Sequence, residues 1–161
     1  MIILNHLILY RIKIKITCMS DYLPFNLLGW LPVGIDEILN TPDDAKIGYA
    51  VEVDIEIPRE IHEKLKDYPP CPEVMSVKTE WLSDYQKDIL KLNKSNHAQS
   101  SKLILNLFNK EKYICHYRYL KFIKSLGCII TKVHRVLAFE QSQWMKPYID
   151  LNTRFYKRGE K

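Results

Sequence analysis

An alternating stretch, VEVDIEI at residues 51–57, constrains the fold more than any other part of the chain. Apolar and acidic side chains follow one another along it, in the order Val51, Glu52, Val53, Asp54, Ile55, Glu56 and Ile57. A period of two is typical of a strand with one buried and one solvent-facing side. Pro58 lacks the amide hydrogen that a sheet needs, so the sequence predicts a strand over residues 49–57.

The three carboxylates of this strand allow two interpretations. Paired carboxylates can hold two magnesium ions for phosphoryl transfer. The alternation by itself, however, already places Glu52, Asp54 and Glu56 on the solvent side. We therefore interpret them as the polar face of an amphipathic strand.

The composition is typical of one globular domain. The 161 residues are 47% hydrophobic and 27% charged, which suffices for a core. A net charge of +5 is compatible with a nucleic-acid partner but too small to identify one. The four cysteines lack metal-ligand spacing and accompany no secretory signal, so we expect reduced thiols in an intracellular protein of undetermined compartment. The sequence contains neither a Walker loop nor a dinucleotide fingerprint.

The first forty residues divide into two parts. Residues 1–20 begin with an apolar run too short to span a bilayer, so we expect no membrane partner. Residues 11–17 then alternate as a basic strand, and Met19 is a second candidate start. Residues 21–40 contain Pro24, Gly29, Pro32 and Gly34, which predict turns rather than one long element.

The remainder predicts an α+β fold. We expect a mixed, mostly antiparallel sheet with helices on one face. After the central strand come a helix over 59–66, an extended proline segment over 68–72, and a helix over 84–92 capped by Ser83. A loop over 93–102 follows, with His97 as a solvated side chain. Strands over 103–108 and 112–116 should form a hairpin around residues 109–111. A helix over 117–126 ends at Gly127, and a helix over 144–155 and a frayed, charged tail over 157–161 close the chain.

The strand predicted over residues 128–140 has no purely apolar side. A strict period of two would place Ile129, Thr131, Val133, Arg135 and Leu137 on its inner side. Arg135 does not suit a core, so we expect a bulge or a change of face.

Several stretches occur in an order that resembles one family. They are GYAVEVDIEIP, DYPPCPE, LSDYQKDIL, and KEKYICHYRYLKFIKSLGCIITKVHRVLAFEQSQWMKPYIDLNT. They resemble the protein-primed family-B DNA polymerases of large self-replicating DNA transposons and related viruses. The resemblance implies that residues 21–156 are part of a polymerase palm and its insertion. It leaves residues 1–20 as an unmatched extension and 157–161 as a tail.

The first palm motif of that family has the form D-x-N-x-L-Y-G-W. Leu27, Gly29 and Trp30 match it, and Asn26 lies beside the position of its asparagine. The metal-binding aspartate of the family falls on Leu23, and the tyrosine that screens the ribose falls on Leu28. Asp21 is two residues early, a displacement of ~6–7 Å in an extended chain.

The family's other catalytic motifs are not found in these residues. A fingers lysine should follow YIDLNT, and a D-T-D-S hairpin should follow later, but the sequence reaches Lys161 without either. The intact family uses magnesium, whereas we expect no cofactor, metal site or catalytic residue in this chain. The resemblance therefore implies a truncated polymerase segment without activity of its own.

The function that the resemblance still implies for this chain is binding of DNA or of a priming protein. The matching region helps intact relatives to hold DNA and a priming protein. Candidate phosphate contacts are the basic residues of the last predicted strand and the helix before it, namely Arg118, Lys121, Lys132, His134 and Arg135. Alternatively these residues form an ordinary solvated face. A stand-alone module that binds DNA or a priming protein, and a decayed reading frame, are the other hypotheses, and the oligomeric state stays open.

Overall fold

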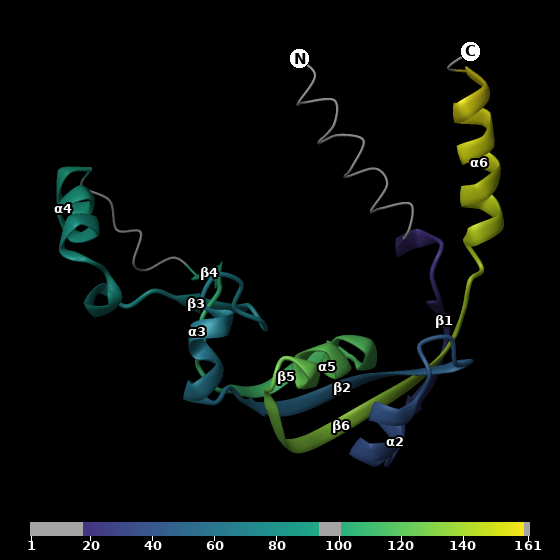
Figure 1. Ribbon diagram of the computed structural model, residues 1–161, viewed down its shortest axis with the longest axis horizontal. Coiled ribbons are helices and arrows are strands. Elements are labelled where there is room, and N and C mark those ends of the chain that lie inside the picture. The colour runs from purple at the N-terminus through teal and green to yellow at the C-terminus, as the bar shows by residue number, and fades with distance from the viewer. Residues whose placement is uncertain (1–17, 94–100, 160–161) are drawn as a thin grey trace. The chain divides into compact units, whose positions relative to one another are not determined.

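The computed structural model describes residues 18–93 and 101–159 (Figure 1). The chain divides into two compact units. The described residues of the first unit fall within Met1–Glu52, Ile114–Lys121 and Val133–Lys161, and those of the second within Val53–Tyr113 and Phe122–Lys132. The basic strand predicted over residues 11–17, His97 and the last two residues lie outside the described residues.

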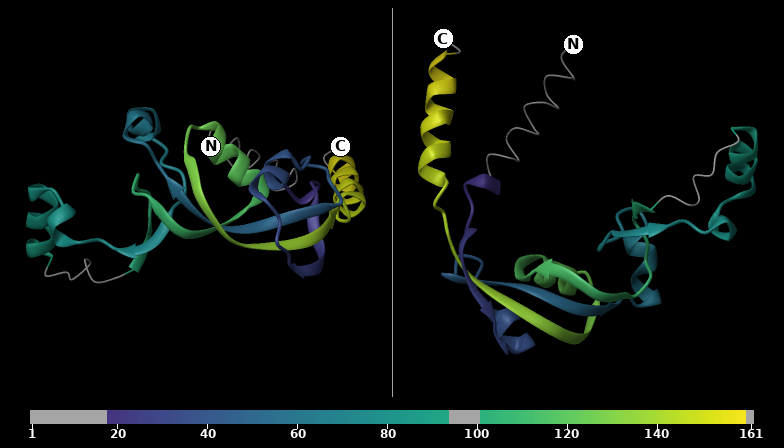
Figure 2. Two further views of the ribbon diagram at one scale, coloured as in Figure 1. Left: turned by 90° about the horizontal axis from the view of Figure 1, so that it is seen from below. Right: turned by 180° about the vertical axis from the view of Figure 1, so that it is seen from behind.

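The structure is an α+β fold with a mostly antiparallel sheet, as the sequence predicted. Four strands form this sheet in the order β1-β6-β2-β5, and two more form a small antiparallel sheet (Figure 1, Figure 2). The strands are β1 Leu23–Trp30, β2 Ile47–Glu56, β3 Glu73–Ser76, β4 Ser101–Ile104, β5 Lys110–His116 and β6 Ile129–Ser142. The α-helices are α2 Ile35–Asn40, α3 His62–Leu65, α4 Asp84–Leu92, α5 Tyr117–Ser125 and α6 Lys146–Gly159. Short 3₁₀ turns occupy Arg59–Ile61 and Thr79–Trp81.

Strand β2 confirms the alternation that dominates the sequence. Val51, Val53 and Ile55 are almost fully buried, with an exposed fraction of 0% for Val53, whereas Ile47 at the start of the strand is 42% exposed. The acidic side chains occupy the other side, where Asp54 accepts a hydrogen bond from the backbone N–H of Lys112 at 2.7 Å. The interpretation of these carboxylates as a polar face agrees with the contacts that they make.

Helix α5 contributes one apolar face to the core of the first unit. Tyr117 and Leu120 are fully buried, and the Tyr117 ring meets the Tyr49 ring edge-on at 6.3 Å between centroids. Ile38 of α2 joins the same core. The helix ends as predicted, because Gly127 adopts a φ of +102° that suits glycine.

The sequence correctly predicts that no single long element fills residues 21–40, but the prediction that the segment is mainly turns is wrong, because it contains an eight-residue strand and a helix. β1 pairs antiparallel with β6, and the register shifts between Pro24 and Asn26 and again between Leu27 and Gly29. The strand thus absorbs its turn-forming residues as bulges, and Gly29 takes a φ of +104° within one of them.

The predicted hairpin over residues 103–116 is also wrong. β4 pairs with β3, whereas β5 lies beside β2 in the larger sheet. Asparagine side chains stabilise the connection between β4 and β5: Asn106 accepts from the Phe108 N–H, and Asn109 accepts from the Ile57 N–H, both at 3.0 Å. Local side-chain bonds of this kind replace the ladder that a hairpin would need.

β6 changes its buried side partway along, as expected. Val136 and Ala138 are buried, and then Phe139 and Gln141 are buried instead. The predicted inner side was wrong, since none of its five residues is buried. The last helix also differs from the prediction, because α6 begins at Lys146 and continues to Gly159 through most of the predicted tail.

Candidate functional site

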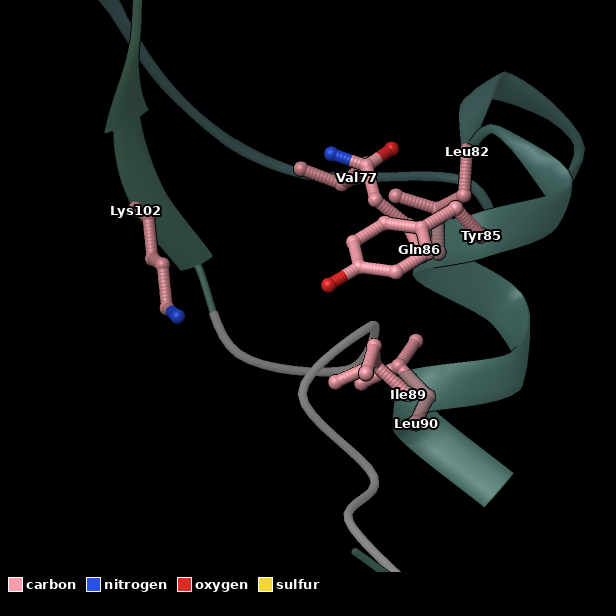
Figure 3. Close-up of a pocket in the computed structure, with 7 residues that line it drawn as sticks. All are labelled: Val77, Leu82, Tyr85, Gln86, Ile89, Leu90 and Lys102. Carbon is pink, nitrogen blue, oxygen red and sulfur yellow. The ribbon is translucent and has the colours of Figure 1, made fainter. Parts of the chain in front are cut away.

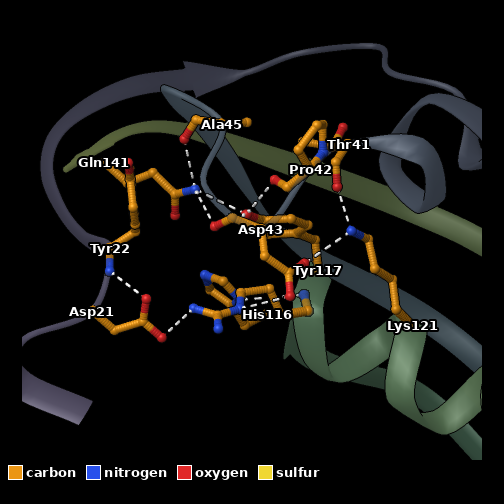
Figure 4. Close-up of polar contacts among 11 residues, drawn as sticks. Asp21, Tyr22, Thr41, Pro42, Asp43, Ala45, His116, Tyr117, Lys121 and Gln141 are labelled. Atoms are coloured by element: carbon orange, nitrogen blue, oxygen red, sulfur yellow. Dashed lines mark hydrogen bonds and ion pairs between the residues drawn. The ribbon is translucent and has the colours of Figure 1, made fainter. Parts of the chain in front are cut away.

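Arg118, the second residue of α5, lies between two carboxylates in a polar cluster of the first unit. Figure 4 labels its partners Asp21 and Asp43. Its Nη1 donates to Asp21 Oδ2 at 2.7 Å, and its Nε lies 3.4 Å from Asp43 Oδ2. Lys121, three residues along the helix, contacts Asp43 Oδ1 at 3.0 Å and the carbonyl of Thr41. The helical spacing places both cations on one side of α5. We call Arg118, Lys121, Asp21 and Asp43 the Arg118 cluster.

Charges within the Arg118 cluster balance one another. Burial alone would raise the pKa of Asp21, but the Tyr22 N–H, at 2.8 Å, and the Arg118 guanidinium bring it below its ordinary value. The hydrogen bond to Asp21 in turn raises the pKa of Arg118. Each carboxylate is therefore held by a cationic side chain of this chain.

The carboxylates of the Arg118 cluster are bound to cationic side chains rather than free to hold metal ions. A metal pair needs carboxylate oxygens free to converge on the ions, whereas Asp21 and Asp43 converge on Arg118. Leu23, at the position of the family's aspartate, pairs with Ser142 in the sheet. Within residues 18–93 and 101–159, no three His, Cys, Asp or Glu side chains group to hold a metal.

A buried hydrogen-bond network fixes the loop beneath the Arg118 cluster. Gln141 Nε2 donates to the Ala45 carbonyl and to the Tyr117 hydroxyl, both at 2.8 Å. The Tyr117 hydroxyl donates to the Pro42 and Asp43 carbonyls at 3.1 Å. Because these groups are buried, their satisfied bonds hold the loop against α5. The Arg118 cluster is thus built into the fold.

The five predicted phosphate contacts do not form one group. Arg118 and Lys121 lie together, with carboxylates as partners. His134 and Arg135 belong to the first unit on β6, and Lys132 belongs to the second unit. Arg135 is held beside the exposed aromatic ring of Trp30. Contact with DNA stays a prediction for all five.

Trp30 and Arg135 form a surface site on the polar side of the sheet. Trp30 lies opposite Leu137 in the β1–β6 ladder, and Arg135 is two residues further along β6. Diagonal neighbours of this kind share a face of the sheet, and the guanidinium carbon lies 4.9 Å from the Trp30 ring centroid. A hydrogen bond of 3.0 Å from Leu31 N–H to the Val136 carbonyl continues the pairing beyond Trp30.

A concavity of about 220 Å³ opens at this site. We call it the Trp30 pocket, and it is lined by Trp30, Leu31, Pro32, His134, Arg135 and Val136. Its lining has two ring systems, an arginine and an apolar wall, and it includes no carboxylate. Trp30 has an exposed fraction of 59%, so most of its indole is open to a ligand.

Glu52 on β2 orients the arginine of the Trp30 pocket. Its Oε2 accepts a hydrogen bond from Arg135 Nε at 2.5 Å, which raises the pKa of Arg135. Because the strand order is β1-β6-β2, Trp30, Arg135 and Glu52 follow one another across three adjacent strands. The Nε edge of the guanidinium is therefore bound to Glu52, and the guanidinium carbon lies over the Trp30 ring. We expect its Nη groups to remain available to a ligand.

Sequence reasoning singled out Arg135 but missed the role of its neighbours. Trp30 was noted only as part of a motif, and Glu52 only as part of a polar face. The contacts join residues far apart in sequence, since Glu52 and Arg135 are 83 positions apart. The exposed position of Trp30 follows from β1 being a strand, which the sequence did not predict.

A second concavity, about 380 Å³, lies in the second unit beside α4. Figure 3 shows Tyr85, Ile89 and Leu90 projecting from α4, with Lys102 of β4 across from them. α4 begins as predicted at Asp84, and the side chain of its cap residue Ser83 forms a reciprocal capping box with Gln86. The lining is mostly apolar, with Tyr85, Gln86 and Lys102 as its polar residues.

Of the helices that the structure describes, none combines the length and apolar character needed to cross a bilayer. Comparisons of the chain with family models, curated proteins and solved structures found no match.

Proposed function

We propose that this chain is a DNA-binding segment of the type found in protein-primed family-B DNA polymerases, and that it does not transfer nucleotides itself. The resemblance is most specific over residues 116–153, and its first palm motif lies at residues 26–30. Their pairing supports the proposal, because Gly29 lies opposite Ala138 and Trp30 opposite Leu137. Two regions that carry the resemblance are thus neighbours in one sheet.

The observation that carries the binding proposal is the oriented arginine of the Trp30 pocket. An exposed aromatic ring beside a cation is the arrangement with which proteins hold nucleic acid, through base stacking and phosphate contact. The net charge of +5 favours approach to a polyanion. DNA is therefore the partner that the chemistry of the site supports best.

The proposal that the chain does not transfer nucleotides is based on its carboxylates. Two-metal transfer needs acidic groups that bind ions, and the position of the family's aspartate holds Leu23. The nearest acid in sequence, Asp21, is bound to Arg118 at 2.7 Å. A purified chain should give no dNTP-dependent primer extension with magnesium or manganese. Extension that persists through purification would contradict this part of the proposal.

Binding is tested by titrating a labelled DNA duplex with a single-stranded tail at several salt concentrations. We expect affinity to fall as salt rises, because phosphate contacts release counterions. Replacing Arg135 with Ala should lower the magnitude of the salt slope by about 1 for each phosphate that the arginine binds. The matched control is Lys124→Ala, which removes an equally positive, exposed residue from α5. A flat salt response, or equal effects of the two variants, would overturn the binding proposal.

A further inference from the structure

From the geometry of the Trp30 pocket, we infer that it takes an unstacked base of single-stranded DNA, with the neighbouring phosphate on Arg135. This inference rests on the proposed function, since it names the form of DNA that the same site binds. Three features of the site support it: the openness of the ring, the orientation of the arginine and the size of the concavity.

The ring of Trp30 can be reached only by a base that has left a stack. One side of the indole is covered by Arg135, at 4.9 Å from its centroid, and the side chain remains largely exposed. In a duplex the faces of the bases are occupied by adjacent base pairs. Away from its ends, a duplex can therefore offer phosphates to Arg135 but no base face to Trp30, whereas a single strand can offer both along its whole length.

The arginine is held in one orientation before any ligand arrives. Its Nε is bound to Glu52, whose side chain has an exposed fraction of only 12%. The contact with Trp30, 4.9 Å from the guanidinium carbon to the ring centroid, restricts the guanidinium further. Pre-organisation of this kind lowers the entropy lost on binding. The Nη edge is then placed to meet a phosphate that flanks the stacked base.

The size of the concavity fits one base rather than a larger ligand. Its volume of about 220 Å³ is below the ~300–1,000 Å³ of typical small-molecule pockets. It exceeds by severalfold the ~30 Å³ that a water molecule occupies in the liquid. Leu31 and Pro32 supply an apolar edge, and His134 supplies a second ring. A DNA base, which is planar and uncharged, suits the aromatic and apolar residues of this lining, and the phosphate attached to it suits Arg135.

The experiment compares three probes on the wild-type chain by fluorescence anisotropy: a labelled oligo-dT, an abasic oligonucleotide of the same length, and a blunt hairpin duplex. The abasic strand keeps every phosphate and lacks every base. We expect oligo-dT to bind about tenfold more tightly than either other probe, in the range of one base–aromatic stack. Equal affinity for oligo-dT and the abasic strand would overturn the inference while leaving DNA binding in place.

Variants then assign the preference to the Trp30 pocket. Trp30→Ala should remove the preference for oligo-dT over the abasic strand, and Trp30→Phe should keep most of it. Trp144→Ala is the matched control, because Trp144 is similarly exposed, at 54%, and does not line the pocket. Loss of the preference in Trp144→Ala, or its survival in Trp30→Ala, would contradict the inference. If no probe binds at any salt concentration, the proposed function fails as well, so the two failures are distinct.

Discussion

At the scale of single residues, His116 contacts both the aromatic core of the first unit and the charged residues of the Arg118 cluster. Its ring packs against Tyr117 at 4.7 Å and Phe139 at 5.6 Å between centroids. Its Nδ1 accepts the Arg118 backbone N–H at 3.3 Å, which only an unprotonated Nδ1 can do. Burial lowers the pKa of His116, the Arg118 charge lowers it further, and Asp43 and Asp21 oppose both effects.

This lowered pKa predicts a pH dependence of stability. The unfolded chain binds a proton on His116 near the ordinary value of 6.5, and the folded chain binds it only at a lower pH. The free energy of unfolding should therefore be fully retained above about pH 6.5 and decrease as the pH falls below it. Urea unfolding at a series of pH values measures this slope. His116→Phe keeps a packed ring and should flatten it, and an unchanged slope in that variant would show that other groups are responsible.

At the scale of elements, β2 and β6 approach so closely that only glycine fits at position 48. A Cβ there would lie 2.5 Å from Phe139 Cε2 and 2.8 Å from Gln141 Oε1. Neither neighbour can move freely: Phe139 is buried against His116, and Gln141 is held through its Nε2. In the part of the chain that the structure describes, Gln141 Oε1 has no hydrogen-bond partner, so the cost of displacing the Gln141 side chain comes from the bonds of its Nε2.

Gly48→Ala should therefore destabilise the chain by about 1–3 kcal/mol, the usual cost of overpacking a core. Gly34→Ala is the matched control, because nothing lies within 4 Å of its Cβ position and its φ is −74°. Its effect on stability should be close to zero. Alanine is a poorer helix cap than glycine, which destabilises the folded state slightly, but it also lowers the conformational entropy of the unfolded chain, which stabilises the folded state by a similar amount. Thermal unfolding of both variants measures the difference. Comparable losses in the two would show that the close approach at Gly48 relaxes without cost.

The elements that the sequence predicted are those whose signals are local. The alternation of β2, the Ser83 cap of α4 and the Gly127 end of α5 each lie within a few residues, and each is present. β1 was missed because Pro24 and Gly29 indicate turns unless a partner strand accommodates the bulges. The Arg118 cluster was missed for the same reason, as Asp21 and Arg118 are 97 positions apart. No local pattern encodes a contact that depends on the pairing of distant strands.

At the scale of the whole molecule, large apolar side chains remain exposed on both units. On β1, Leu27 is 66% exposed at the edge of the four-stranded sheet, and on β4, Leu103 is 68% exposed. Exposed apolar residues on an edge strand favour pairing with other chains. Association through exposed apolar side chains does not depend on the positive charges that would bind DNA. Salt therefore distinguishes self-association from DNA binding. Sulfate strengthens apolar association, whereas ionic strength weakens contact with DNA phosphates.

We therefore expect the chain to self-associate as its concentration rises, and more so in ammonium sulfate, under conditions in which DNA binding weakens. Sedimentation velocity measures the association. Leu27→Lys places a charge on the edge strand and should shift the distribution toward monomer. Asn152→Lys adds the same charge to an exposed position of α6 and should shift it less. If both variants act alike, net charge rather than the apolar edge controls association. If neither variant changes the distribution and the chain stays monomeric in sulfate, the exposed apolar side chains are not sites of self-association. In that case the bulges of the edge strand β1 suffice to block pairing with another chain.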